Sequence, residues 1–139
     1  EITKKSLQIN KLSLTSTLAK INDKSLYLKV KNFLTNSRSN FVNQYEVQTN
    51  TIDEIFKDLN LEKTLLKIDV EGFEMNVIKG SKMKLEKIPF ILMENQFGSQ
   101  YQDVNFNEIK ELLNKARFKV LKKFIFPTLH YQDVLFKKI

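Results

Sequence analysis

The most constraining feature of this 139-residue chain is a short aliphatic segment that ends in charge. Residues 65–70 read Leu-Leu-Lys-Ile-Asp-Val, which is typical of a strand buried on both faces, and such strands are normally continuous hydrophobic runs. Lys67 and Asp69 interrupt the run, and Glu71 continues their spacing of two. Residues two apart project to one side of an extended backbone, so a cation and two carboxylates meet near the strand's carboxyl end. Ligands bind at that end of the strands in open α/β sheets, so these residues form a candidate site.

A second strand with a polar end follows this segment. The pattern predicts a helix from Glu74 to about residue 87, a break at Pro89 and a buried strand over residues 90–93, followed by Glu94, Asn95 and Gln96. A right-handed crossover sets the two strands parallel and close together. We therefore expect Asp69, Glu71 and Glu94 to line one pocket.

The turn between strand and helix contains Gly72, whose missing side chain suits a sharp bend or a ligand close to the backbone. Glu74, two residues later, falls in the first helical turn, where a carboxylate either complements the helix dipole or contributes to the site. Gly80 lies within the helical pattern and favours close packing. No glycine-rich phosphate-binding loop occurs in the sequence.

The rest of the chain alternates between predicted strands and helices. We expect the end of a helix over residues 2–12, a hairpin of strands 14–21 and 26–30, and a lid-like loop over residues 32–44. Thr51 has the chemistry of a helix cap. The remaining predicted elements are strands 45–49, 118–126 and 134–137 and a helix over residues 105–115. These elements predict one α/β domain with a mostly parallel sheet, and the abrupt start at Glu1 predicts that the chain begins inside an element.

Composition excludes several functions. The chain has no cysteine and hence no disulfide, thiolate nucleophile or cysteine metal site. Its formal net charge is +7, but Arg38 and Arg117 are the only arginines and the lysines are scattered, so we expect no nucleic-acid partner. No membrane span or signal segment is evident, and the predicted location is the cytoplasm. The only histidine, His130, has no local partner for catalysis.

Residues 65–74, 77–80 and 91–94, together with Pro89, resemble the signature of the FkbM family of S-adenosylmethionine-dependent methyltransferases. Upstream, Thr51-Ile52-Asp53 resembles the family's threonine-hydrophobic-aspartate step. Leu7 and Asn10 resemble the helix after its second strand. The resemblance covers most of the chain and is strongest over residues 51–95.

This resemblance implies a Rossmann-like class I methyltransferase sheet, S-adenosylmethionine as cofactor, and methyl transfer to a hydroxyl oxygen of a small molecule or sugar. The glycine loop of the family, its first two strands and the acidic residue that holds the ribose have no counterpart in the sequence. Residues 1–139 are therefore expected to be a single partial domain, truncated at the N-terminus and inactive alone. Ile21 and Asp69 are the expected neighbours of the cofactor.

The predicted mechanism is direct displacement, with Asp69 as the carboxylate that accepts or orients the proton of the acceptor hydroxyl and positioning as the main source of rate. Lys67 is expected to adjust the acidity of Asp69. Glu71, also counted among the catalytic residues, acts with Glu94 and Asn95 to hold the acceptor or a cation. Two alternatives stay open: a metal-dependent hydrolase that uses the same carboxylates, and a non-catalytic basic binding module.

Overall fold

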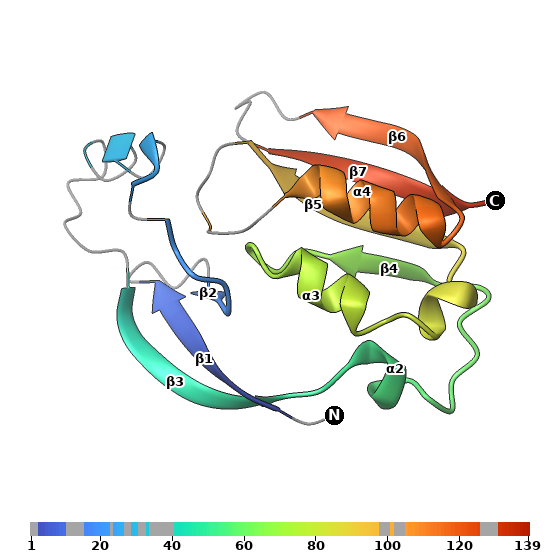
Figure 1. The fold of residues 1–139 in the computed structure, drawn as a ribbon, viewed down its shortest axis with the longest axis horizontal. Helices are drawn as coiled ribbons and strands as arrows, with labels where there is room; N and C mark the ends of the chain where they lie inside the picture. The colour runs from blue at the N-terminus through green and yellow to red at the C-terminus, as the bar shows by residue number, and fades with distance from the viewer. Residues whose placement is uncertain are drawn as a thin grey trace.

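The protein is described here from a computed structural model. It describes residues 3–10, 16–22, 24–26, 29–30, 33, 41–97, 101, 105–125 and 131–139. These residues form two separate sheets, one of three strands and one of four (Figure 1). Among the described residues, no helix has the length and apolar character that a membrane crossing requires.

The first sheet is antiparallel and comes from the N-terminal part of the chain. Strand β1 (Thr3–Asn10) lies between β2 (Ser16–Thr17) and β3 (Phe41–Thr49). The prediction of a helix over residues 2–12, with Leu7 and Asn10 inside it, is therefore wrong. Leu7 and Ile9 are two residues apart, a spacing that suits a strand, and β1 pairs along its whole length with β3, more than thirty residues later.

Three further N-terminal predictions need correction. In place of a strand over residues 14–21, β2 is the only strand among the described residues 16–21, and Ile21 makes an isolated antiparallel bridge with Tyr101. The strand predicted over residues 26–30 is wrong, because the described residues 26, 29 and 30 are helical. The loop predicted over 32–44 extends too far, since β3 already begins at residue 41. Most of that loop lies outside the described residues.

The second sheet has the order β4-β5-β7-β6. Its strands are β4 (Leu65–Ile68), β5 (Phe90–Gln96), β6 (Phe118–Ile125) and β7 (Tyr131–Lys138). Only β4 and β5 run parallel, because a helical crossover joins them, whereas β7 is antiparallel to both β5 and β6. The mixed α/β character is confirmed. The expected Rossmann-like, mostly parallel sheet is not evident, since most of the strand pairs are antiparallel.

Helices α3 (Glu74–Lys79) and α4 (Phe106–Lys115) lie on one face of this sheet (Figure 1). The apolar positions of β5 and β7 that alternate toward this face are fully buried, among them Ile91, Met93 and Val134. They pack with residues of α4 such as Ile109. The core of the described structure therefore sits between the sheet and its two helices.

The helix predicted from residue 74 to 87 divides into two elements. Helix α3 ends at the cap residue Gly80, and a short 3-10 helix, η1 (Lys84–Glu86), follows. Helix α2 (Ile52–Ile55) begins at Thr51, whose side chain accepts a hydrogen bond from the Glu54 backbone, which confirms the predicted cap. Asp53, in the first turn of α2, accepts hydrogen bonds from the Met83 and Lys84 backbone amides and so fixes the start of η1.

Candidate functional site

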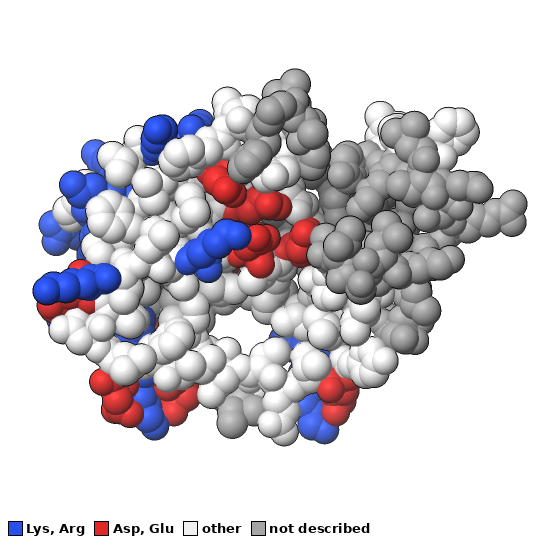
Figure 2. Space-filling model, turned by 180° about the vertical axis from the view of Figure 1, so that it is seen from behind, with Lys and Arg blue, Asp and Glu red and all other residues white. Residues whose placement is uncertain are grey.

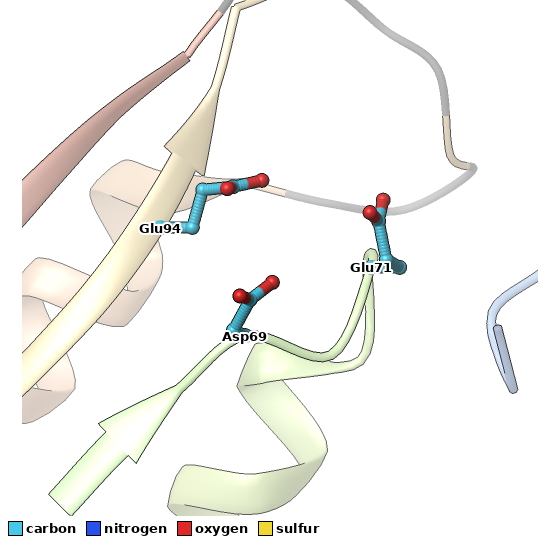
Figure 3. Close-up of side chains that lie close together, drawn as sticks. All are labelled: Asp69, Glu71 and Glu94. Atoms are coloured by element: carbon cyan, nitrogen blue, oxygen red, sulfur yellow. The ribbon is translucent and has the colours of Figure 1, made fainter. Parts of the chain in front are cut away.

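Three carboxylates converge at the carboxyl ends of β4 and β5. Asp69 directly follows β4, Glu71 lies in the turn before α3, and Glu94 belongs to β5 (Figure 3). One oxygen from each group lies within 4.8 Å of the others. Figure 2 shows acidic side chains gathered near the centre of the sheet face opposite the helices. The parallel register, which pairs Ile68 with Met93, places the two strand ends side by side.

The turn that carries Glu71 has an uncommon backbone. Glu71 has φ 50° and Gly72 has φ 93°, both in the left-handed region that residues other than glycine rarely adopt. The Thr17 hydroxyl donates to the Glu71 carbonyl, and the Gly72 amide donates to Glu74 Oε1 at 3.0 Å. The ring of Tyr101 packs so closely on Gly72 that an added Cβ would lie 2.4 Å from Tyr101 Cγ. Contacts from several parts of the chain therefore fix the turn.

The carboxylate of Glu71 is held by two donors. The Tyr101 hydroxyl donates to Glu71 Oε2 at 2.6 Å, and Gln96 Nε2 donates to the same oxygen at 2.7 Å. Gln96 Nε2 also donates to Glu94 Oε1 at 2.9 Å. Glu94 and Gln96 are two apart in β5 and lie on the same face, so one amide group connects two of the three carboxylates.

The charges of the site affect one another. Lys67 Nζ lies 2.9 Å from Asp69 Oδ2, and this hydrogen-bonded ion pair raises the pKa of Lys67. Burial raises the pKa of Glu94, the charges of Asp69, Glu71 and Asp133 add to the rise, and the bond from Gln96 opposes it. Glu94 therefore holds a proton more readily than an exposed glutamate does.

Glu74 is buried at the start of α3, with 6% of its surface exposed. This burial raises the pKa of Glu74, and the hydrogen bond from the Gly72 amide opposes the rise. Its bond to Gly72 ties α3 to the turn, so Glu74 supports the site's backbone. Glu74 also lines the small pocket that contains Glu94, so its two predicted roles, at the helix dipole and in the site, both stay open.

The predicted site residues are brought together only in part. Asp69, Glu71 and Glu94 converge, and Lys67 contacts Asp69. Asn95 follows Glu94 in β5 and alternates to the other face of the strand, yet both residues line the same small pocket at the end of β5. Ile21, expected beside the cofactor, forms a backbone bridge with Tyr101, and His130 lies outside the described residues.

Tyr101, Gln96 and Thr17 were not predicted as site residues, although each contacts Glu71. The polar end of the second strand was a signal for Gln96. The sequence around Tyr101 and Thr17 carries none, because their contacts with Glu71 span 30 and 54 residues.

A cavity of about 770 Å³ lies between the two sheets, next to the carboxylates. Strand β1 contributes Lys5 and Leu7 to its wall, and the end of β4 contributes Asp69 and Val70. Neither Glu71, Glu94 nor Ile21 is among its lining residues. Glu94 instead lines a smaller pocket of about 70 Å³ with Tyr101. The oxygens of the three carboxylates nevertheless lie within 4.8 Å of one another, so one small ligand could contact all three, and a single common pocket stays a prediction.

The sequence matches the model of the Methyltransferase FkbM domain over residues 4–120, which is most of the chain. The chain belongs to the FkbM methyltransferase family. No match was found among curated proteins or among solved structures. The matched region contains all three converging carboxylates, which places the described site inside the methyltransferase domain.

Membership of the FkbM family implies methyl transfer from S-adenosylmethionine to an acceptor. The larger cavity is in the usual size range of small-molecule sites and so fits such a cofactor in volume. Asp69 lies on its wall and would adjoin a cofactor bound there, where its carboxylate could accept a hydrogen bond from a hydroxyl group. The carboxylate oxygens of Asp69, Glu71 and Glu94 are also the ligand type that hard divalent cations take.

Proposed function

We propose that this FkbM-family domain methylates a hydroxyl oxygen of a small molecule or sugar. Bound S-adenosylmethionine supplies an activated methyl group. The convergence of Asp69, Glu71 and Glu94 beside a cavity of suitable size is the observation that supports this function. A hydroxyl loses its proton as it becomes an ether, and a carboxylate at the reacting centre can accept that proton.

Asp69 is our choice for the proton acceptor, because it is the one carboxylate of the three that also lines the larger cavity. Its carboxylate also accepts a hydrogen bond from Lys67 at 2.9 Å. We assign to Glu94, whose pKa burial raises, the role of holding a hydroxyl of the acceptor, while Tyr101 and Gln96 donate to the carboxylate of Glu71. Positioning of the two reactants by these groups supplies most of the rate.

The proposal extends to the domain as a whole. We propose that residues 1–139 act as one unit in the cytoplasm and contribute the acceptor side of the site. The glycine loop that the family resemblance implies is absent from these residues. We expect these residues to bind S-adenosylmethionine weakly on their own, and activity is measured in the protein as the cell makes it.

The substitution Asp69→Asn tests the proton-acceptor role. It nearly preserves size, so we expect methyl transfer to fall by about a hundredfold or more while the affinity for S-adenosylmethionine changes little. Transfer of a labelled methyl group to a panel of sugars and hydroxylated small molecules measures the first effect, and calorimetric titration measures the second. The exposed Asp58→Asn is the matched control.

Two results would contradict this assignment. Wild-type turnover by Asp69→Asn would remove Asp69 from the proton-acceptor role. Loss of S-adenosylmethionine binding by the same variant would move Asp69 to the cofactor's site. If the wild-type polypeptide bound the cofactor but methylated none of the hydroxyl compounds, a hydroxyl acceptor would be wrong.

A further inference from the structure

We propose that Tyr101 is a positioning residue of the methyl-transfer site, where its hydroxyl group holds the carboxylate of Glu71 beside those of Asp69 and Glu94. The inference rests on the proposed function for its effect on catalysis. The claim that Tyr101 sets the orientation of the Glu71 side chain does not depend on the proposed function. It is argued only from contacts of the described residues.

The ring of Tyr101 is fixed before its hydroxyl acts. Tyr101 is 7% exposed, and its backbone forms an antiparallel bridge with Ile21. On the other side, the ring occupies the space where a side chain at Gly72 would stand. Because the Tyr101 backbone and one edge of its ring are both held, the position of its hydroxyl group is fixed. This hydroxyl lies 2.6 Å from Glu71 Oε2.

Glu71 needs this support for two reasons. Its φ of 50° is unfavourable for a residue with a side chain and costs about 1 kcal/mol or more. Its carboxylate also faces two others, all with oxygens within 4.8 Å, and like charges at this distance repel. Without donors to Oε2, we expect the Glu71 side chain to turn toward solvent.

Two donors oppose this movement by meeting at one oxygen of Glu71. Gln96 reaches Oε2 from β5 at 2.7 Å and also holds Glu94, so Gln96 sets the distance between the two glutamates. The hydroxyl of Tyr101 is the second donor to Oε2. Hydrogen bonds to a charged group are among the stronger ones in proteins. Tyr101 therefore completes a hydrogen-bonded chain that runs through Glu71 and Gln96 to Glu94.

The substitution Tyr101→Phe isolates this role, because it removes the hydroxyl and keeps the ring that packs on Gly72. In the protein labelled with carbon-13 at glutamate carboxyl groups, the Glu71 resonance is assigned by its loss in Glu71→Gln. We expect this resonance to move by more than its linewidth in Tyr101→Phe. The resonance should not move in Tyr45→Phe. Tyr45 serves as the control because it lies in β3 of the three-stranded sheet and is 52% exposed.

An unchanged Glu71 resonance in folded Tyr101→Phe would overturn the inference. Tyr101→Leu, which also removes the ring, separates this role from packing: we expect a much larger loss of thermal stability in Tyr101→Leu than in Tyr101→Phe. If both variants lose the same stability and neither moves the Glu71 resonance, Tyr101 has only a packing role.

Methyl transfer provides a second readout. We expect kcat of Tyr101→Phe to fall about tenfold or more, with KM for S-adenosylmethionine within about twofold of wild type. An increase in KM alone would contradict a positioning role. If the wild-type polypeptide methylates no acceptor, the proposed function fails, and the carboxyl resonance still decides whether Tyr101 controls Glu71.

Discussion

At the scale of single residues, Gly72 is where the site depends most on a missing side chain. Its φ is 93°, and a Cβ would lie 2.4–2.8 Å from three atoms of the Tyr101 side chain. We expect Gly72→Ala to lower the free energy of unfolding by about 2–3 kcal/mol, because the backbone becomes strained and the ring must move. Urea denaturation followed by circular dichroism measures this difference.

Gly80→Ala is the control for this prediction. Gly80 has φ −86°, and its added Cβ would meet its nearest atoms, in Thr51 and Asn76, at 3.4 Å. We expect a change of about 1 kcal/mol or less. Equal losses for the two variants would show that the turn at Gly72 adapts to a side chain and that the Tyr101 contact does not constrain it.

At the scale of elements, Asp53 joins α2 to the segment between α3 and β5. Its carboxylate accepts from the Lys84 amide at 2.8 Å and from the Met83 amide at 3.1 Å, thirty residues away. We expect Asp53→Ala to cost about 1–2 kcal/mol, because two backbone amides lose their acceptor. Glu54→Ala, in the same helical turn with only an exposed ion pair to Lys57, should cost about 0.5 kcal/mol or less. Equal costs in thermal unfolding would remove Asp53 from this capping role.

These contacts give the threonine-hydrophobic-aspartate step of the family resemblance a physical role. Thr51 caps α2 with its own side chain, and Asp53 caps the start of η1. The Asp53 amide in turn donates to the Gly80 carbonyl at 3.0 Å, at the end of α3. Residues 51–53 therefore stabilise the crossover between β4 and β5. This crossover in turn determines how Asp69 and Glu94 align.

At the scale of the whole molecule, β4 is an edge strand. Among the described residues it pairs only with β5, and Leu65 is 54% exposed. An exposed edge with apolar side chains can pair with a strand of another chain. We therefore expect the 139-residue chain to self-associate and Leu65→Lys to reduce that association, with little change in stability. Sedimentation velocity over a range of concentrations measures it.

The control for the edge strand is Leu59→Lys, which adds the same charge at a residue that is 56% exposed and lies outside the sheets. A general effect of charge would reduce association equally in both variants, and that outcome would contradict a role for the β4 edge. A wild-type chain that stays monomeric at all concentrations would also contradict it.

The sequence alone determined the local features of this protein. The strand that begins at residue 65, the turn at Gly72, the break at Pro89 and the cap at Thr51 were predictable because each depends on neighbours within a few residues. The convergence of Asp69 with Glu94 was also predictable, because a short right-handed crossover leaves one arrangement for two parallel strands.

Only the tertiary structure decided the features that depend on distant partners. The segment around Leu7 and Ile9 has spacings compatible with a helix or a strand, and pairing with β3 makes it a strand. Strand β7 enters the sheet between β5 and β6, which makes most of the pairing antiparallel. Tyr101 acquires its role from a hydroxyl that reaches Glu71 across 30 residues. Local patterns carry no record of such contacts, because the energy that selects them comes from pairing and packing between segments that are far apart in the chain.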